Sequence, residues 1–153
     1  MPSDFSKEVS SFGEEKISDE DLTGDGRGDD PHVTVLYGLH SYDPTEAEEI
    51  LETLSPLKIE LGLISSFSDN PDFDVIKIDI TGKDLFKANE LLKELPYTSK
   101  YEYHPHMTLA YVKKGHCKEL IGSSHFKGKK ITLDRVDYSC KDDVHTEIVL
   151  SGR

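Results

Sequence analysis

The sequence has 153 residues, of which 35% are hydrophobic and 31% are charged, and its formal net charge at pH 7 is -12. This length favours one domain, or two small lobes that share one core. The charge argues against duplex nucleic acid as a partner, because such binding depends on Lys and Arg contacts to phosphates. The composition also argues against a membrane protein, since no apolar run approaches the ~18 residues of a spanning helix.

The sequence contains two cysteines, Cys117 and Cys140, whose spacing fits neither a disulfide framework nor a metal site. Its first residues lack the basic and apolar regions of a secretory signal. We therefore expect a cytoplasmic protein with reduced thiols. The composition carries no indication of the oligomeric state.

The first 30 residues are acidic and poor in aliphatic side chains. We predict that this segment is partly irregular and that one domain follows over residues 31–153. Residues 21–32 resemble the first half of a calcium-binding EF-hand loop. The match fails because the twelfth position, which should be a bidentate Glu, is His32.

The rest of the chain alternates between strand and helix patterns. Asp43 and Pro44 indicate a helix start, and Pro56 and Pro96 indicate helix ends. The predicted elements are a strand over 32–38, a helix between 43 and 56, strands over 57–67 and 73–80, a helix over 82–94, a strand over 105–111, one or two helical turns over 116–121, and strands over 130–140 and 144–150. This order predicts an α+β fold in which antiparallel sheet predominates.

Two strands carry more detailed predictions. Alternation over residues 73–80 places Phe73, Val75, Lys77 and Asp79 on one face and isoleucines on the other. In the strand over 130–140 the apolar phase slips near Arg135, which predicts a β-bulge there.

One pattern occurs twice. Residues 31–37 read Pro-His-Val-Thr-Val-Leu-Tyr, and residues 105–111 read Pro-His-Met-Thr-Leu-Ala-Tyr; we call them the first and the second motif. In an extended strand, side chains at i and i+2 project from one face, so each motif presents a His and a Thr side by side. Strict alternation places Tyr37 and Tyr111 on the opposite face, where we predict that they pack in the core.

Two histidines that face one phosphate are suited to phosphodiester cleavage. The unperturbed pKa of His lies near neutrality, so one imidazole can act as a base while the other acts as an acid. Thr hydroxyls beside them can donate to the non-bridging oxygens. The two motifs therefore predict an active site at His32, Thr34, His106 and Thr108 that requires neither a metal nor a cofactor.

The duplicated His-x-Thr pattern resembles the signature of the two-histidine (2H) phosphoesterase superfamily, over most of residues 31–150. The resemblance implies a bilobal fold, with two pseudo-symmetric lobes of antiparallel sheet and helices outside. Each lobe would give one motif strand to a central cleft. It also implies that His32, Thr34, His106 and Thr108 are the catalytic set.

The residues flanking the motifs are most similar to the phage anti-CBASS cyclic-oligonucleotide phosphodiesterases, which are viral hydrolases. This resemblance implies that the substrate is a cyclic di- or trinucleotide immune signal in the host bacterial cytoplasm. Its 3′–5′ bonds would be cut by attack of a ribose 2′-hydroxyl, through a cyclic phosphate. Such enzymes hold a base with a carboxylate and an aromatic side chain, and Tyr138 is the candidate aromatic residue. The candidate carboxylates are Asp134, Asp137 and Glu147.

Other functions stay open. The chain could be a 2H enzyme acting on 2′,3′-cyclic phosphate ends of RNA, or a sponge that binds a cyclic nucleotide without cutting it. A zinc site of His32, His104 and His106 is a further alternative, although no clear fourth ligand accompanies them. The basic side chains after the second motif are interpreted as solvated charges rather than substrate ligands: Lys113, Lys114, His116, Lys127, Lys129 and Lys130.

Overall fold

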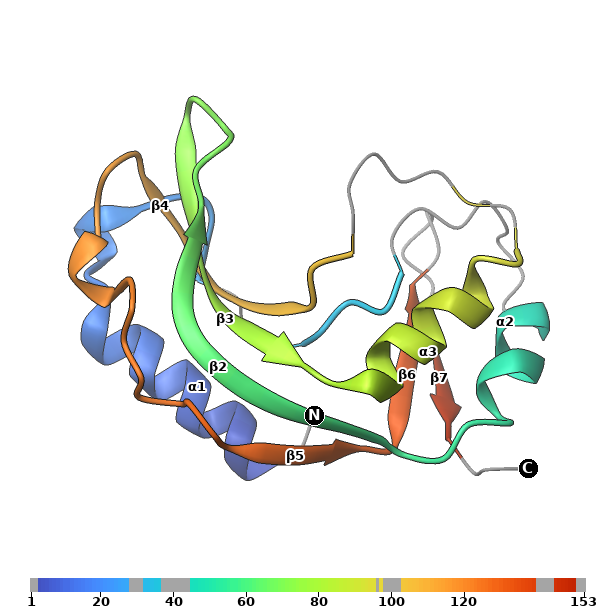
Figure 1. The fold of residues 1–153 in the computed structure, drawn as a ribbon. Helices are drawn as coiled ribbons and strands as arrows, with labels where there is room; N and C mark the ends of the chain where they lie inside the picture. The colour runs from blue at the N-terminus through green and yellow to red at the C-terminus, as the bar shows by residue number, and fades with distance from the viewer. Residues whose placement is uncertain are drawn as a thin grey trace. The chain divides into compact units, whose positions relative to one another are not determined.

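A computed structural model of the chain describes residues 3–27, 32–36, 45–95, 97, 103–139 and 145–150 (Figure 1). The elements along the chain are α1 (Ser3–Lys16), η1 (Asp19–Asp21), β1 (Leu22–Arg27), α2 (Thr45–Leu51), β2 (Leu57–Phe67), β3 (Phe73–Thr81), α3 (Lys83–Leu92), β4 (His106–Lys113), η2 (Lys118–Leu120), β5 (Lys130–Leu133), β6 (Arg135–Ser139) and β7 (His145–Val149). The predicted α+β class is confirmed. Within these ranges no helix combines the length and apolar character needed to cross a membrane.

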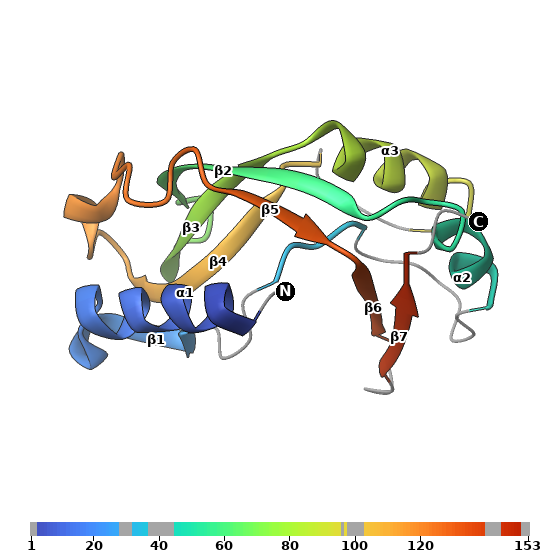
Figure 2. The same cartoon turned by 90° about the horizontal axis from the view of Figure 1, so that it is seen from below.

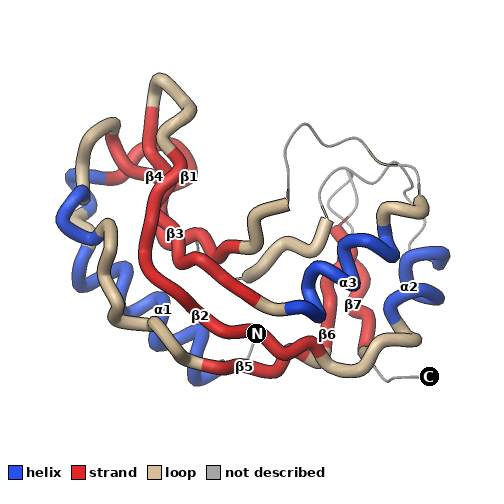
Figure 3. Tube along the Cα trace, in the orientation of Figure 1, coloured by secondary structure: helices blue, strands red, loops and turns tan. Residues whose placement is uncertain are grey.

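The strands form two sheets, marked in red in Figure 3. Five strands make one sheet in the order β1-β4-β3-β2-β5, while β6 and β7 pair separately. Strand β4, which carries the second motif, lies between β1 and β3 and is antiparallel to both. The second motif therefore lies inside the sheet rather than at its edge.

The chain divides into two compact units. The first unit comprises Met1–Val33, Glu60–Ile80 and Pro105–Lys129, and the second comprises Thr34–Ile59, Thr81–His104 and Lys130–Arg153. Both motif histidines, His32 and His106, belong to the first unit. The N-terminal segment is therefore part of the same unit as the histidines.

The prediction of an irregular N-terminal segment is wrong for residues 3–27. Helix α1 buries Phe5, Val9 and Phe12, whose i, i+4, i+7 spacing places them on one helix face. The Phe12 and Phe126 ring centroids lie 5.0 Å apart, and α1 contacts β4 (Figure 2). Residues Leu22–Arg27 then form β1, which satisfies backbone groups along one edge of β4.

The strongest periodic patterns gave correct elements. Strand β2 spans the predicted 57–67, β3 ends one residue after the predicted 73–80, and α3 lies within the predicted 82–94. The single turn η2 lies within 116–121. The predicted helix start at Asp43 and Pro44 lies outside the described residues.

The bulge predicted near Arg135 is wrong. The predicted strand over 130–140 is instead two strands, β5 and β6, which belong to different sheets and are separated by Asp134. The slip in apolar phase marks the point where the chain leaves one sheet for the other. Strand β7 lies within the predicted 144–150 and pairs antiparallel with β6, while residues 140–144 lie outside the described ranges.

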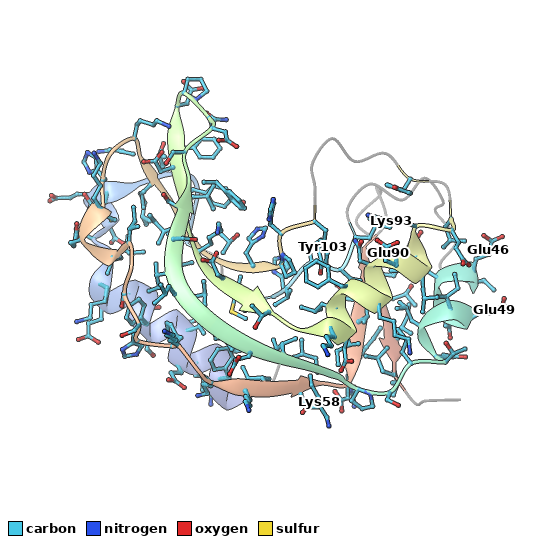
Figure 4. All side chains as sticks on the ribbon, viewed as in Figure 1. Glu46, Glu49, Lys58, Glu90, Lys93 and Tyr103 are labelled. Carbon is cyan, nitrogen blue, oxygen red and sulfur yellow. The ribbon has the colours of Figure 1, made fainter. Side chains whose placement is uncertain are left out.

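In the second unit, α2 and α3 contact each other and have amphipathic faces. Ala47 and Leu51 of α2, like Leu85 of α3, are almost completely buried. Figure 4 shows Glu46 and Glu49 projecting from α2 toward solvent. The acidic side chains and the buried Ala47 and Leu51 thus lie on different faces of α2.

Candidate active site

The two motifs meet in the first unit. Val33 forms an antiparallel bridge with Met107, the residue at the same position of the second motif. Further along β4, Leu22 of β1 pairs with Val112 and Arg27 pairs with Ala110. The bridge from Val33 to Met107 comes next in the same direction. Leu22–Arg27 and Val33 therefore both pair antiparallel with β4, and Val33 brings the first motif beside the second.

The first motif is not the strand predicted over 32–38. Within its described residues, 32–36, the bridge at Val33 is the one ladder contact. Side chains of the second unit bind the next two carbonyls instead: the Tyr103 hydroxyl donates to Thr34 O (2.7 Å), and Asn89 Nδ2 donates to Val35 O (2.8 Å). Tyr103, labelled in Figure 4, packs edge-on against Phe86 of α3. These bonds satisfy backbone acceptors that a strand partner would otherwise take.

The bridge fixes which side chains share a face. With Val33 opposite Met107 in an antiparallel pair, His32 lies opposite Thr108 and diagonal to His106. Diagonal residues of this kind are about 7 to 8 Å apart. Met107 is fully buried, His106 and Thr108 are half-buried, and His32 is exposed. The two imidazoles and the Thr108 hydroxyl thus lie on the more accessible face.

Thr34, the fourth predicted site residue, is exposed and belongs to the second unit. Its carbonyl is held by Tyr103, whose own pKa burial raises well above its usual value. A neutral phenol is therefore available as the donor across the ordinary pH range.

On β3, Lys77 and Asp79 lie across from the second motif. Their Cα partners are Thr108 and His106 respectively, so both side chains are on the face of the motif's His and Thr. Lys77 is only 7% exposed, and a buried ammonium group requires partners. Its Nζ lies 2.5 Å from Asp79 Oδ1 and 2.5 Å from Ser65 Oγ, and Ser65 donates to the same carboxylate oxygen (2.8 Å).

Phe67 connects this cluster to the second motif. Its ring meets the His106 imidazole edge to face at 4.9 Å, and Lys77 Nζ lies 4.5 Å from its centroid. We call Ser65, Phe67, Lys77 and Asp79 the support cluster. Sequence reasoning placed Lys77 and Asp79 on one face, which is confirmed, but it did not connect them to His106. The available signal was the single Lys among the isoleucines of this strand.

The prediction that Tyr111 faces the core is wrong. In the pairing of β3 with β4, Ile76 lies opposite Ala110 but the next residue, Lys77, lies opposite Thr108. Leu109 is therefore an extra residue on β4, and both Leu109 and Ala110 are buried. This bulge reverses the alternation, and Tyr111 becomes the partner of Val75 on the face of Lys77. Tyr111 is half-buried, and its ring contacts Phe73. Tyr37 lies outside the described residues.

The C-terminal candidates lie in the second unit. Tyr138 is 8% exposed and pairs with Thr146 across the β6–β7 hairpin. Asp134 and Asp137 are exposed, and Glu147 forms an ion pair with Arg135. Burial leaves little of the Tyr138 ring for contact with a ligand, whereas the carboxylates are accessible.

Several basic residues after the second motif stabilise the first unit. Lys114 Nζ lies 3.0 Å from Asp74 Oδ1 and donates to Ser68 O, while His116 Nδ1 lies 2.7 Å from Asp21 Oδ1. In the same way, Lys129 forms an ion pair with Glu8 of α1 (2.5 Å). These three side chains anchor the β2–β3 loop and the N-terminal segment.

In the described part of the chain, no three His, Cys, Asp or Glu side chains are grouped as a metal site would require. His104 is exposed just before the second motif. Cys117 is a buried free thiol, and burial together with the charges of Asp21 and Glu119 raises its pKa to about 11.

No protein-family model and no curated protein matches this sequence. Among solved structures, the crystal structure of TT0787 of Thermus thermophilus is similar over 100% of this chain and 95% of that chain. The TM-score is 0.65 and the sequence identity is 14%. The chain shares its fold with TT0787. At this identity the likeness concerns the fold alone.

Proposed function

We propose that this protein is a phosphodiesterase of the 2H type that hydrolyses 3′–5′ bonds of cyclic di- and trinucleotide second messengers without a metal. The proposal rests above all on the bridge between Val33 and Met107. It places the two copies of the Pro-His-x-Thr pattern side by side, with two imidazoles diagonal to each other. A phosphoryl group fits the spacing of about 7 to 8 Å that this register gives.

The proposed reaction has two steps. In the first, one neutral imidazole accepts the proton of a ribose 2′-hydroxyl, whose oxygen attacks the adjacent phosphorus. The bond from phosphorus to the 5′-oxygen breaks, and the other, protonated imidazole gives that oxygen its proton. In the second step the roles reverse, and water opens the resulting 2′,3′-cyclic phosphate. Each imidazole would contribute on the order of 10²–10⁴-fold to the rate.

The neighbouring groups support this chemistry. The Thr108 hydroxyl lies on the same face as His106 and can donate to a non-bridging oxygen as charge develops. The resemblance assigns the same role to Thr34. Asp79 is the cross-strand neighbour of His106 and is held by Lys77 and Ser65.

The 2H architecture itself, two lobes about a central cleft, is part of the proposal. So is the biological setting, a phage protein that removes CBASS signals in the cytoplasm of a host bacterium. The charge of -12 agrees with a small ligand rather than a long duplex. The TT0787 likeness supports a known fold and contributes nothing to the choice of substrate.

The test is to incubate the protein with 3′,3′-cyclic di-AMP and with a cyclic trinucleotide in excess EDTA, and to follow linear products. We expect cleavage that EDTA leaves unchanged, and a transient 2′,3′-cyclic phosphate. Cleavage abolished by EDTA would refute the metal-free reaction. Intact ligand recovered after denaturing the protein would instead indicate a sponge, and a preference for RNA 2′,3′-cyclic ends would indicate the RNA-processing alternative.

A further inference from the structure

We propose that Tyr111 and Phe73 form a nucleobase-stacking subsite on the same face of the sheet as His106 and Thr108. This inference rests on the proposed function, because it names where the base of the bound nucleotide lies. It assigns a binding role to a tyrosine that strict alternation would place in the core.

The register of β3 and β4 shows which side chains share a face. On β4, Thr108 pairs with Lys77 and Tyr111 pairs with Val75. Phe73 of β3 pairs with Lys113. Lys77, Val75 and Phe73 alternate along β3 and so project from one face. Tyr111 and Phe73 therefore lie on the face that also bears Thr108.

The spacing suits one nucleotide. From Lys77 to Val75 the strand advances two residues, which is roughly 7 Å. Tyr111 thus lies about that far along the face from Thr108. A ribose spans this gap when its phosphate lies beside Thr108, which is opposite His32, so the attached base reaches the aromatic pair.

The two rings form a platform rather than a closed core. Their centroids are 5.5 Å apart and their planes are inclined at 74°. Both side chains remain half-buried, in contrast to the fully buried Ile76 and Val112 on the other face. An edge-to-face pair of this kind leaves aromatic surface for a further ring, and nucleobases stack readily on exposed aromatic side chains.

The bulge at Leu109, which places Tyr111 on the face of Thr108, also favours a binding role for Tyr111. An extra residue disrupts the ladder and leaves one residue unpaired, and bulges often lie next to active sites, where they redirect a side chain. Here the redirected residue is an aromatic one beside the second motif. Stacking on it would tolerate any base, which agrees with substrates that differ in their nucleobases.

The test compares Tyr111→Leu, which keeps apolar packing but loses stacking, with Tyr111→Phe, which keeps both. Initial rates with 3′,3′-cyclic di-AMP give KM and kcat, and titration in the non-cleaving His32→Ala background gives Kd. We expect Tyr111→Leu to raise KM and Kd about 5- to 150-fold with kcat nearly unchanged, and Tyr111→Phe to behave as wild type. Ile121→Ala, which changes an exposed side chain of the same unit, is the matched control.

The outcomes separate the two proposals. Cleavage by the wild type, with KM and Kd unaltered in a folded Tyr111→Leu, would overturn the stacking subsite and leave the phosphodiesterase intact. Binding without cleavage would overturn the proposed phosphodiesterase activity. The stacking subsite would then stand if Tyr111→Leu raised Kd and would fall if it did not. A wild type that neither binds nor cleaves the cyclic nucleotide would overturn both.

Discussion

Replacing Asn89 tests how the first motif is held. Asn89 lies on α3, is 2% exposed, and donates to Val35 O at 2.8 Å within a buried environment. In Asn89→Leu that carbonyl loses its donor where water cannot replace it, which costs about 1–3 kcal/mol. The higher helix propensity of Leu returns up to ~0.5 kcal/mol. For a chain of this size, each kcal/mol shifts Tm by about 2–4 °C.

Tyr103→Phe is the matched control, since it removes the donor to the adjacent carbonyl, that of Thr34, in an exposed hydrogen bond. Tyr103 is half-buried whereas Asn89 is almost completely buried, so water replaces the Tyr103 donor more easily and we expect a smaller loss of about 0.5–1.5 kcal/mol. Urea unfolding followed by circular dichroism measures both changes. An Asn89→Leu protein as stable as the wild type, or a larger loss in Tyr103→Phe, would mean that the Asn89 bond does not hold the first motif.

Three further predictions concern the first unit. Lys77→Met should lower kcat about 10- to 100-fold by loosening the support cluster, whereas Lys58→Met, at an exposed lysine, should not; equal kcat values would contradict this. The Gly115 N–H, with Lys114, holds the pKa of Asp74 below its usual value, so Asp74 stabilises the fold above the usual Asp range, and this contribution is lost as pH falls through the lowered pKa. When the free energy of unfolding is measured at decreasing pH, it should fall less steeply in Asp74→Asn than in the wild type. The same pH dependence in both proteins would mean that Asp74 does not make this contribution. Phe12→Ala should cost about 3–5 kcal/mol in urea unfolding, and a loss near zero would mean that α1 does not anchor the fold.

The elements that sequence patterns predicted well are those whose local and tertiary preferences agree. Leu57–Phe67, Phe73–Thr81 and Lys83–Leu92 each show a clear period. In α1 the pattern of Phe5, Val9 and Phe12 was present, but the surrounding Ser, Glu and Gly residues concealed it as a polar segment.

The parts that could not be predicted depend on partners elsewhere in the chain. The first motif has the β-branched residues of a strand, yet side chains of the second unit bind its carbonyls. The bulge at Leu109 arises from the register with β3, so the outward position of Tyr111 cannot be read from one strand alone. The pairing of Asp79 with His106 likewise requires the sheet order.

We propose above that His32 and His106 act as one acid–base pair on one phosphate. Single-turnover cleavage of 3′,3′-cyclic di-AMP in EDTA, by His32→Ala, His106→Ala and the double variant, tests it most directly. Each single variant should lose on the order of 10²–10⁴-fold in rate, and the double variant should be little slower than either, because residues that act as a unit are not additive. A single variant that cleaves at the wild-type rate, or losses that multiply in the double variant, would mean that the two imidazoles do not act as one pair.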